Sequence, residues 1–262
     1  MAQMRKLAVV TGASTGIGLE LARCAAQDGC DLIICADEPQ IHSAAESLRQ
    51  SGVTVDVVEA DLGTEQGLDT LWNAVRNREV DYLLANAGRG LGDAFLEQDW
   101  DRIEDVIHVN VTGTTSLLHR MIPLMRARKT GRILIVGSIA GLIPGSFQAV
   151  YNATKAYLDT LSWGIRDELK DSGVTVTCLM PGPTDTEFFV RADMEDTPVG
   201  QKDKDDPAKV ARAGYRAMLK GSSGVTTGFM NKVQAALSGV VPDSVLASMH
   251  RNLAEPEGHR ND

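Results

Sequence analysis

The chain of 262 residues has little positive charge and no long apolar run. Its 35 acidic residues outnumber its 26 lysines and arginines, and the formal net charge is -9. We expect no nucleic-acid partner, because such partners favour a basic surface. Every apolar stretch falls short of the roughly 20 residues that span a bilayer, so a membrane partner is also not expected. The N-terminal apolar segment is too short for a secretory signal, and a cytoplasmic protein is therefore predicted.

The cysteines and histidines are few and are not spaced as ligands. No metal or disulfide spacing relates the four cysteines, which are Cys24, Cys30, Cys35 and Cys178. We expect all four to be reduced residues that serve packing. The five histidines have no partners at ligand spacing, so no metal site is expected. The sequence around Ser138 also lacks the GxSxG pattern of an α/β-hydrolase.

Apolar, β-branched runs alternate with amphipathic stretches of helical length along the whole chain. Strands are predicted at Leu7–Val10, Leu32–Cys35, Val53–Val58, Tyr82–Ala85, Ile133–Val136 and Val174–Leu179. Helices are predicted at about 16–28, 40–50, 65–77, 97–127, 148–170 and 207–220, with a looser set after 230. This alternation predicts an α/β fold of right-handed βαβ units, whose parallel sheet carries helices on both faces. The length suits one domain over residues 1–262.

Two segments stand apart from this pattern. Residues 183–206 form the longest polar, aperiodic stretch and follow a predicted strand, so we expect a lid over the substrate. The segment at about 230–262 is a variable C-terminal region. Within it, residues 233–253 alternate apolar and small side chains but are interrupted by Gly239 and Pro242. We expect this stretch to cover the substrate pocket or to contact another subunit.

A glycine-rich turn, TGASTGIG, joins the first predicted strand to the first predicted helix at Thr11–Gly18. Its glycines allow a tight turn and a close approach of backbone to phosphate, and the helix start offers free N–H groups. The spacing is GxxxGxG. It differs from GxGxxG because Leu21 occupies the position of the last small residue. Between a strand and a helix, this turn predicts a dinucleotide site.

Asp37 follows the second predicted strand, twenty-five residues after Gly12. A carboxylate at such a position accepts hydrogen bonds from the adenosine ribose and repels a 2′-phosphate. No base stands in the neighbouring residues 36–40, and Thr15 rather than a base precedes Gly16. Both absences favour NAD, with NADP as the alternative.

Tyr151, Lys155 and Ser138 form a candidate proton-transfer group. A helix over 148–170 would place Tyr151 and Lys155 on one face. The strand Ile133–Gly137 would bring Ser138 to the carboxyl edge of the sheet, where open α/β sheets bind ligands. We expect the lysine to lower the phenol pKa from about 10, and the serine to donate a hydrogen bond to a carbonyl oxygen. With a dinucleotide nearby, the trio predicts hydride transfer to or from a carbonyl carbon.

These residues together make residues 5–190 resemble the short-chain dehydrogenase/reductase family. TGASTGIG is similar to its pyrophosphate turn, Asp61-Leu62 to its adenine contact, and Asn86-Ala87-Gly88 to its NAG signature. Thr184 departs from the usual Val or Ile, but that residue acts through its backbone. The resemblance implies a single-domain Rossmann fold, doubly wound, with a mainly parallel sheet of seven strands.

The resemblance also implies roles for individual residues. It places the following at the cofactor: Gly12, Ser14, Thr15, Gly16, Ile17, Gly18, Asp37, Asp61, Leu62, Asn86, Ala87, Gly88, Tyr151, Lys155, Pro181, Gly182, Thr184 and Thr186. Its catalytic tetrad corresponds to Asn110, Ser138, Tyr151 and Lys155. Tyr151 would be the general acid/base, and Lys155 would hold the nicotinamide ribose. Asn110 would hold a water that links the lysine to solvent.

The expected substrate is an apolar secondary alcohol or ketone, because the residues near the trio are mostly apolar. The predicted walls are Ile139, Leu142, Ile143, Phe147, Gln148, Phe188 and Phe189, with Arg89 and Arg191 as possible polar exceptions. We predict an NAD-dependent oxidoreductase of the short-chain type. The alternatives are an NADPH-dependent ketoreductase of the 3-oxoacyl type and a dinucleotide-sensing regulator without chemistry. The family also implies a homodimer or homotetramer through the helices at 97–127 and 148–170.

Overall fold

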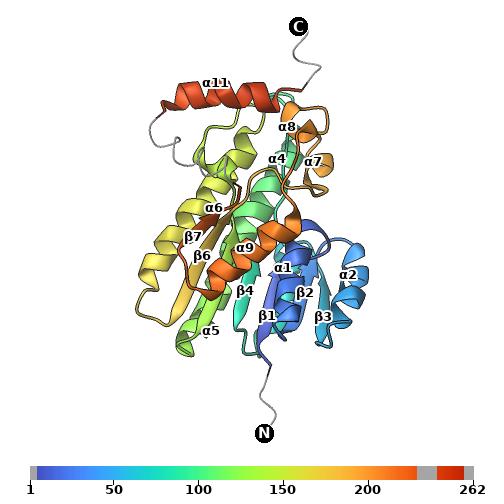
Figure 1. Ribbon diagram of the computed structural model, residues 1–262, viewed down its shortest axis with the longest axis vertical. Coiled ribbons are helices and arrows are strands. Elements are labelled where there is room, and N and C mark those ends of the chain that lie inside the picture. Colours follow the sequence, from blue (N-terminus) through green and yellow to red (C-terminus); the bar gives the residue numbers. More distant parts are fainter. Residues whose placement is uncertain (1–4, 229–240, 257–262) are drawn as a thin grey trace.

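The computed structural model describes residues 5–228 and 241–256, so part of the predicted C-terminal segment at 230–262 lies outside the described residues. Seven parallel strands form one sheet in the order β3-β2-β1-β4-β5-β6-β7, with helices on both faces (Figure 1). The strands are β1 Leu7–Thr11, β2 Asp31–Ala36, β3 Val55–Glu59, β4 Tyr82–Ala85, β5 Gly131–Val136, β6 Val174–Met180 and β7 Gly224–Thr226. The predicted Rossmann-type α/β fold is confirmed.

Each face of the sheet has its own hydrophobic core. The larger helices are α1 Gly16–Gln27, α2 Gln40–Arg49, α3 Glu65–Val75, α4 Trp100–Ile107, α5 Thr114–Ala127, α6 Ala149–Glu168, α9 Pro207–Leu219 and α11 Asp243–Ala254. Along β2, Leu32 and Ile34 join the core under α1, α2 and α9, whereas Ile33 and Cys35 join the core under α3, α5 and α6. Side chains alternate between the two faces of a strand, so a strand buried on both faces is apolar throughout.

The strand order places a binding cleft at the carboxyl edge of the sheet. β1 pairs with β2 on one side and with β4 on the other. The order therefore reverses beside β1, and open α/β sheets bind ligands outside such a switch point. Two short helices, α7 Phe188–Arg191 and α8 Pro198–Gln201, lie above this edge together with α11 (Figure 1).

The structure differs from the sequence-based expectation in three elements. β7 was not predicted as a strand because it has only three half-buried residues. The third strand lies at Val55–Glu59 rather than 53–58. The helix expected at 97–127 begins at Trp100, where the Asp99 carboxylate caps it, and contains a π-helical turn at His108–Gly113. No helix in the described ranges combines the length and apolar character needed to cross a bilayer.

Candidate active site

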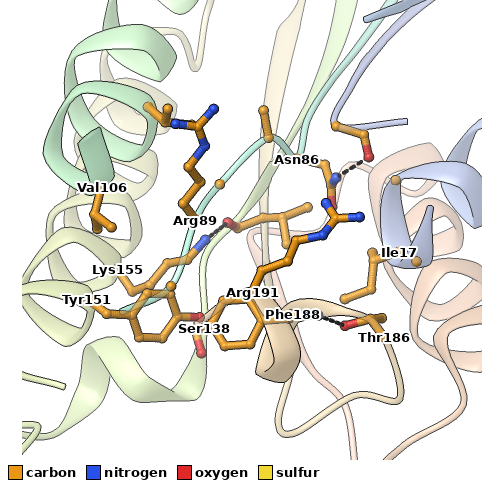
Figure 2. Close-up of a pocket in the computed structure, with 18 of the residues that line it drawn as sticks. Ile17, Asn86, Arg89, Val106, Ser138, Tyr151, Lys155, Thr186, Phe188 and Arg191 are labelled. Carbon is orange, nitrogen blue, oxygen red and sulfur yellow. Dashed lines mark hydrogen bonds between the residues drawn. The ribbon is translucent and has the colours of Figure 1, made fainter. Parts of the chain in front are cut away.

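A cleft of about 470 Å³ opens at the carboxyl edge of the sheet. All eighteen residues predicted at the cofactor line it. They include Tyr151 and Lys155, and Ser138 lies in the wall as well, whereas Asn110 is not among the lining residues. Figure 2 shows Tyr151, Lys155 and Ser138 opposite Ile17 and Asn86 across the cleft. The fold thus brings the candidate proton-transfer trio and the glycine turn into one site.

The glycine turn fits a dinucleotide because its backbone leaves no room for side chains. Gly12 has φ +63°, a conformation that favours glycine, and a Cβ there would lie 2.9 Å from the Ala87 Cα. A Cβ on Gly18 would lie 2.0 Å from the Gly12 carbonyl oxygen. Thr15 is the N-cap of α1 and provides no side-chain cap. The first residues of α1 line the cleft, so the cleft meets the positive end of the helix, where free N–H groups can bind an anion.

Asn86 and Thr11 fasten the end of β4 to this turn. The Asn86 amide nitrogen donates to the carbonyl oxygens of Thr11 and Gly12, at 3.0 and 3.1 Å. The Thr11 hydroxyl accepts from the backbone N–H groups of Asn86 and Ala87, each at 3.0 Å. The Asn86 side chain therefore fixes the backbone of the glycine turn by hydrogen bonds to its carbonyl groups.

Two arginines contact the carboxylates that follow β2. Arg89 forms ion pairs with Asp37 and Asp105, and its Nη2 lies 3.5 Å from the Asp61 carboxylate. Arg191 lies 2.5 Å from Glu38. Residues 36–40 contain no base, yet the fold brings two arginines to this region. Both arginines come from distant parts of the sequence, which is why the local sequence around Asp37 did not reveal them.

Tyr151 and Lys155 lie one turn apart on α6, and Ser138 follows β5. The Lys155 Nζ donates to the Val136 carbonyl oxygen at 3.0 Å and lies 5.8 Å from the centre of the Tyr151 ring (Figure 2). Ser138 hydrogen-bonds to the phenol. These contacts hold the Tyr151 phenol, the Lys155 amine and the Ser138 hydroxyl together at one end of the cleft.

We expected Lys155 to lower the pKa of Tyr151. This expectation was wrong, because the surroundings of Tyr151 in the structure raise its pKa. Burial raises the pKa of Tyr151 to about 12, while the hydrogen bond with Ser138 acts in the opposite direction. The lysine is held by the Val136 carbonyl rather than by the phenol. Burial also lowers the pKa of Lys155 to about 8. Desolvation disfavours the charged form of both groups.

Asn110 lies behind the wall of the cleft, inside the π-helical turn. It is fully buried, and its amide nitrogen donates to the Arg89 carbonyl oxygen and the Thr154 hydroxyl, both at 2.9 Å. Its oxygen accepts from the Arg89 N–H at 2.8 Å. A Cβ on Gly88 would lie 3.1 Å from that oxygen and 3.4 Å from the Lys155 Nζ. Asn110 thus fixes the backbone beside the lysine, and its predicted water relay stays a prediction.

The substrate end of the cleft is largely aromatic and aliphatic. Of the expected walls, Ile139, Ile143, Gln148, Phe188 and Phe189 line it. Leu142 and Phe147 do not. Phe147 lies instead against the Arg251 guanidinium, at 5.1 Å. The Phe188 ring centre is 5.1 Å from that of Tyr151, which places the aromatic side chain directly over the catalytic end.

Residues beyond those expected also reach the substrate end. Val199 and His250 line it, the latter from α11. The His250 ring is fixed by a 2.9 Å hydrogen bond between Nδ1 and the Ser146 carbonyl oxygen. The sequence pattern of the C-terminal stretch predicted a pocket cover but gave no signal for this histidine. α11 therefore contributes a side chain to the cleft, and its role as a pocket cover stays a prediction.

Residues 183–206 lie across the cleft and contact the loop after β4. The Gly92 N–H donates to the Ala192 carbonyl oxygen at 2.8 Å, and Arg102 forms an ion pair with Asp193. A Cβ on Gly90 would lie 2.3 Å from the Phe188 ring. The Phe188 ring therefore packs against the backbone of the loop at Gly90.

Comparison with known proteins agrees with this geometry. A family model described as short chain dehydrogenase matches residues 6–196. An uncharacterized oxidoreductase of Staphylococcus epidermidis is 30% identical over 220 residues, which cover 83% of this chain and 92% of the relative.

Two solved structures are similar over most of the chain. A short-chain dehydrogenase from Sphingobium yanoikuyae in complex with NADPH is 28% identical, with a TM-score of 0.81 over 90% of this chain and 96% of its own. A bulky-bulky ketone specific alcohol dehydrogenase from Comamonas testosteroni is 25% identical, with a TM-score of 0.76 over 91% of this chain and 96% of its own.

Proposed function

The chain belongs to the short-chain dehydrogenase family of oxidoreductases that act on alcohols and ketones, and we propose that it is an NAD-dependent member acting on a bulky, apolar secondary alcohol or ketone. One observation carries this proposal. Tyr151, Ser138 and Lys155 line the same cleft as the glycine turn and Asp37. A proton-transfer group therefore lies within one pocket with the site that fits a dinucleotide.

The nicotinamide, when bound, supplies or accepts the hydride at the carbinol carbon. The protein handles the proton at the oxygen. In ketone reduction, the Tyr151 phenol gives its proton to the carbonyl oxygen, and in alcohol oxidation the phenolate takes it back. Ser138 hydrogen-bonds to the same oxygen as negative charge develops there. Lys155 would hold the nicotinamide ribose and place a positive charge near the phenol.

The preference for NAD is supported by the two carboxylates after β2. Asp37 lines the cleft where the adenosine ribose would lie, and Glu38 follows it. Both would repel a 2′-phosphate. The alternative is an NADPH-dependent ketoreductase of the 3-oxoacyl type. It is favoured by Arg89 and Arg191, which lie close enough to bind a phosphate, and by the NADPH in the Sphingobium yanoikuyae structure.

The substrate preference is supported by the side chains around Tyr151. Ile139, Ile143, Phe188 and Phe189 give this end of the cleft an apolar wall. The similarity to the bulky-bulky ketone specific enzyme of Comamonas testosteroni agrees with a large ketone. Acyl-chain, aromatic, steroid and terpenoid ketones all have suitable chemistry.

The test of the proposed function is Tyr151→Phe, with Tyr157→Phe as the matched control. Tyr157 lies on the same helix and is 39% exposed. A panel of secondary alcohols with NAD and ketones with NADH is screened by nicotinamide absorbance. We expect Tyr151→Phe to lower kcat by roughly 10²–10⁴-fold, the range for general acid/base catalysis, and to bind NADH as before. Equal turnover by wild type and Tyr151→Phe would contradict the assignment.

A further inference from the structure

Asp159 is a buried carboxylate directly beside the catalytic trio. It lies on α6, one helical turn after Lys155 and two turns after Tyr151, so all three side chains share a face of the helix. Only 4% of its surface is exposed. Neither the cleft wall nor the proposed proton transfer includes it.

The chain around Ser138 is shaped to accommodate this carboxylate. A Cβ on Gly137 would lie 1.7 Å from the Asp159 Oδ1, and a Cβ on Gly141 would lie 2.4 Å from its Oδ2. Gly137 directly precedes Ser138, and Gly141 lies within the 3₁₀ turn Ile139–Leu142 that follows it. Any larger residue at either position would displace the carboxylate.

The hydrogen bonds of Asp159 are unevenly distributed. Oδ1 accepts from the Cys178 thiol at 3.3 Å and from the Ser138 N–H at 3.4 Å. Oδ2 is buried without a hydrogen-bond partner among the residues that the structure describes. A buried carboxylate with an unsatisfied oxygen is costly, and an asparagine or an apolar residue of similar size would avoid the cost of burying the charge.

Burial and three neighbouring groups act on the pKa of Asp159 in opposite directions. Burial raises the pKa of its carboxyl to about 6, while the Cys178 thiol, the Lys155 charge and the Ser138 N–H oppose the rise. The titratable groups that interact with it are Lys155 and Tyr151 on α6 and Cys178 on β6. Its negative charge favours the protonated form of both Tyr151 and Lys155.

We propose that Asp159 is a positioning residue of the catalytic trio. Its carboxylate braces the Ser138 backbone and, through its charge, sets the protonation of Lys155 and Tyr151. The proposal rests on the proposed function in one respect, because it assumes that Tyr151 exchanges the proton. It differs from a purely structural role, since a brace alone would act through shape and not through charge.

Asp159→Asn separates shape from charge. The asparagine oxygen can still accept from Cys178 and Ser138, so the bracing geometry is kept while the charge is removed. Because the lost charge favoured the protonated phenol, we expect the rise of the alcohol-oxidation rate with pH to move to lower pH by roughly one pH unit. Asp167→Asn, at an exposed site on the same helix that forms an ion pair with Lys170, is the matched control and should leave the profile in place.

A second readout does not require turnover. Tyrosinate absorbance is titrated in the full-length protein, and the Tyr151 signal is obtained by difference from Tyr151→Phe. We expect that signal to appear at lower pH in Asp159→Asn than in wild type. If wild type were inactive with every substrate, the proposed function would fail while this titration still decided the influence of Asp159 on the phenol.

Cys178→Ala covers the case in which Asp159→Asn does not fold. Removing the thiol donor raises the pKa of the Asp159 carboxyl further, so less of it is charged at neutral pH. We expect a displacement in the same direction as for Asp159→Asn but smaller. The proposal is overturned if the folded variants give rate and absorbance profiles that superimpose on wild type, or profiles displaced to higher pH.

Discussion

Replacing Asp37 by serine should change the cofactor preference of the protein. Asp37 lies at the end of β2 in the cleft, and its side chain is 38% exposed. Its partner Arg89 is 32% exposed. An ion pair this accessible contributes about 1 kcal/mol or less, so a ribose can displace the arginine at little cost. The carboxylate is therefore available to select between NADH and NADPH.

The size of the effect follows from the charges. Two unit charges 4 Å apart interact with about 1 kcal/mol in water and about 4 kcal/mol at an effective dielectric constant of 20. We take about 2 kcal/mol for a 2′-phosphate beside Asp37, because solvent and Arg89 both screen the carboxylate. That value corresponds to roughly 30-fold in Kd. Loss of a charge-assisted hydrogen bond to the ribose, about 1.5 kcal/mol, should weaken NADH roughly tenfold.

The assay is a titration of wild type and Asp37→Ser with NADH and NADPH, followed by nicotinamide fluorescence. We expect wild type to prefer NADH and the variant to lose or reverse that preference. Asp56→Ser, on the neighbouring strand β3 and paired with Arg78, is the control and should change neither Kd. Tighter binding of NADPH by wild type would refute the reasoning and would identify Arg89 and Arg191 as a phosphate site.

Three further predictions concern the same cleft. Because burial raises the pKa of Tyr151 to about 12, we expect alcohol oxidation to accelerate from neutral to alkaline pH while ketone reduction does not, as measured by initial rates across pH. Gly18→Ala forces its Cβ to within 2.0 Å of the Gly12 carbonyl oxygen and should cost about 1–3 kcal/mol of folding free energy, seen as a lower Tm. Its control is Gly164→Ala on α6, outside the cleft, where an added Cβ meets nothing within 4 Å and Tm should stay or rise. Phe188→Ala removes the ring over the catalytic end and should raise KM for bulky ketones roughly tenfold, with shorter ketones much less affected.

The sheet could be predicted from the sequence because its strands are buried on both faces. Leu32, Ile33 and Ile34 are apolar whichever way they point, and each lies in one of the two cores. β7 was not predicted because Gly224–Thr226 is short and half-buried, so its sequence contains no continuous apolar run. The π-helical turn was not predicted because helical periodicity in a sequence does not reveal one extra residue in a turn.

The candidate site was predictable where its residues act through local spacing. Tyr151 and Lys155 are one turn apart, and the glycine turn is contiguous, so sequence distance reports spatial distance. The same spacing could have revealed Asp159, which follows Lys155 by four residues. Contacts between distant segments could not be found in this way. Arg191 meets Glu38 across 153 residues, and only the fold brings them together.

Ionisation was the least predictable property. The sequence suggests that a lysine beside a tyrosine lowers the phenol pKa, but it does not show the burial of the tyrosine. It also does not show that the Lys155 ammonium is held by the Val136 carbonyl oxygen. Desolvation then dominates the charge interaction, and the pKa of Tyr151 rises.

The most direct measurement of the central claim is the transfer of deuterium to a ketone from NADH that carries deuterium at both nicotinamide C4 positions. The product is analysed by mass spectrometry and NMR, with Tyr151→Phe in parallel. Hydride transfer in this cleft predicts one deuterium on the carbinol carbon of the wild-type product and almost no product from the variant. An unlabelled alcohol, or equal labelled product from both proteins, would contradict it.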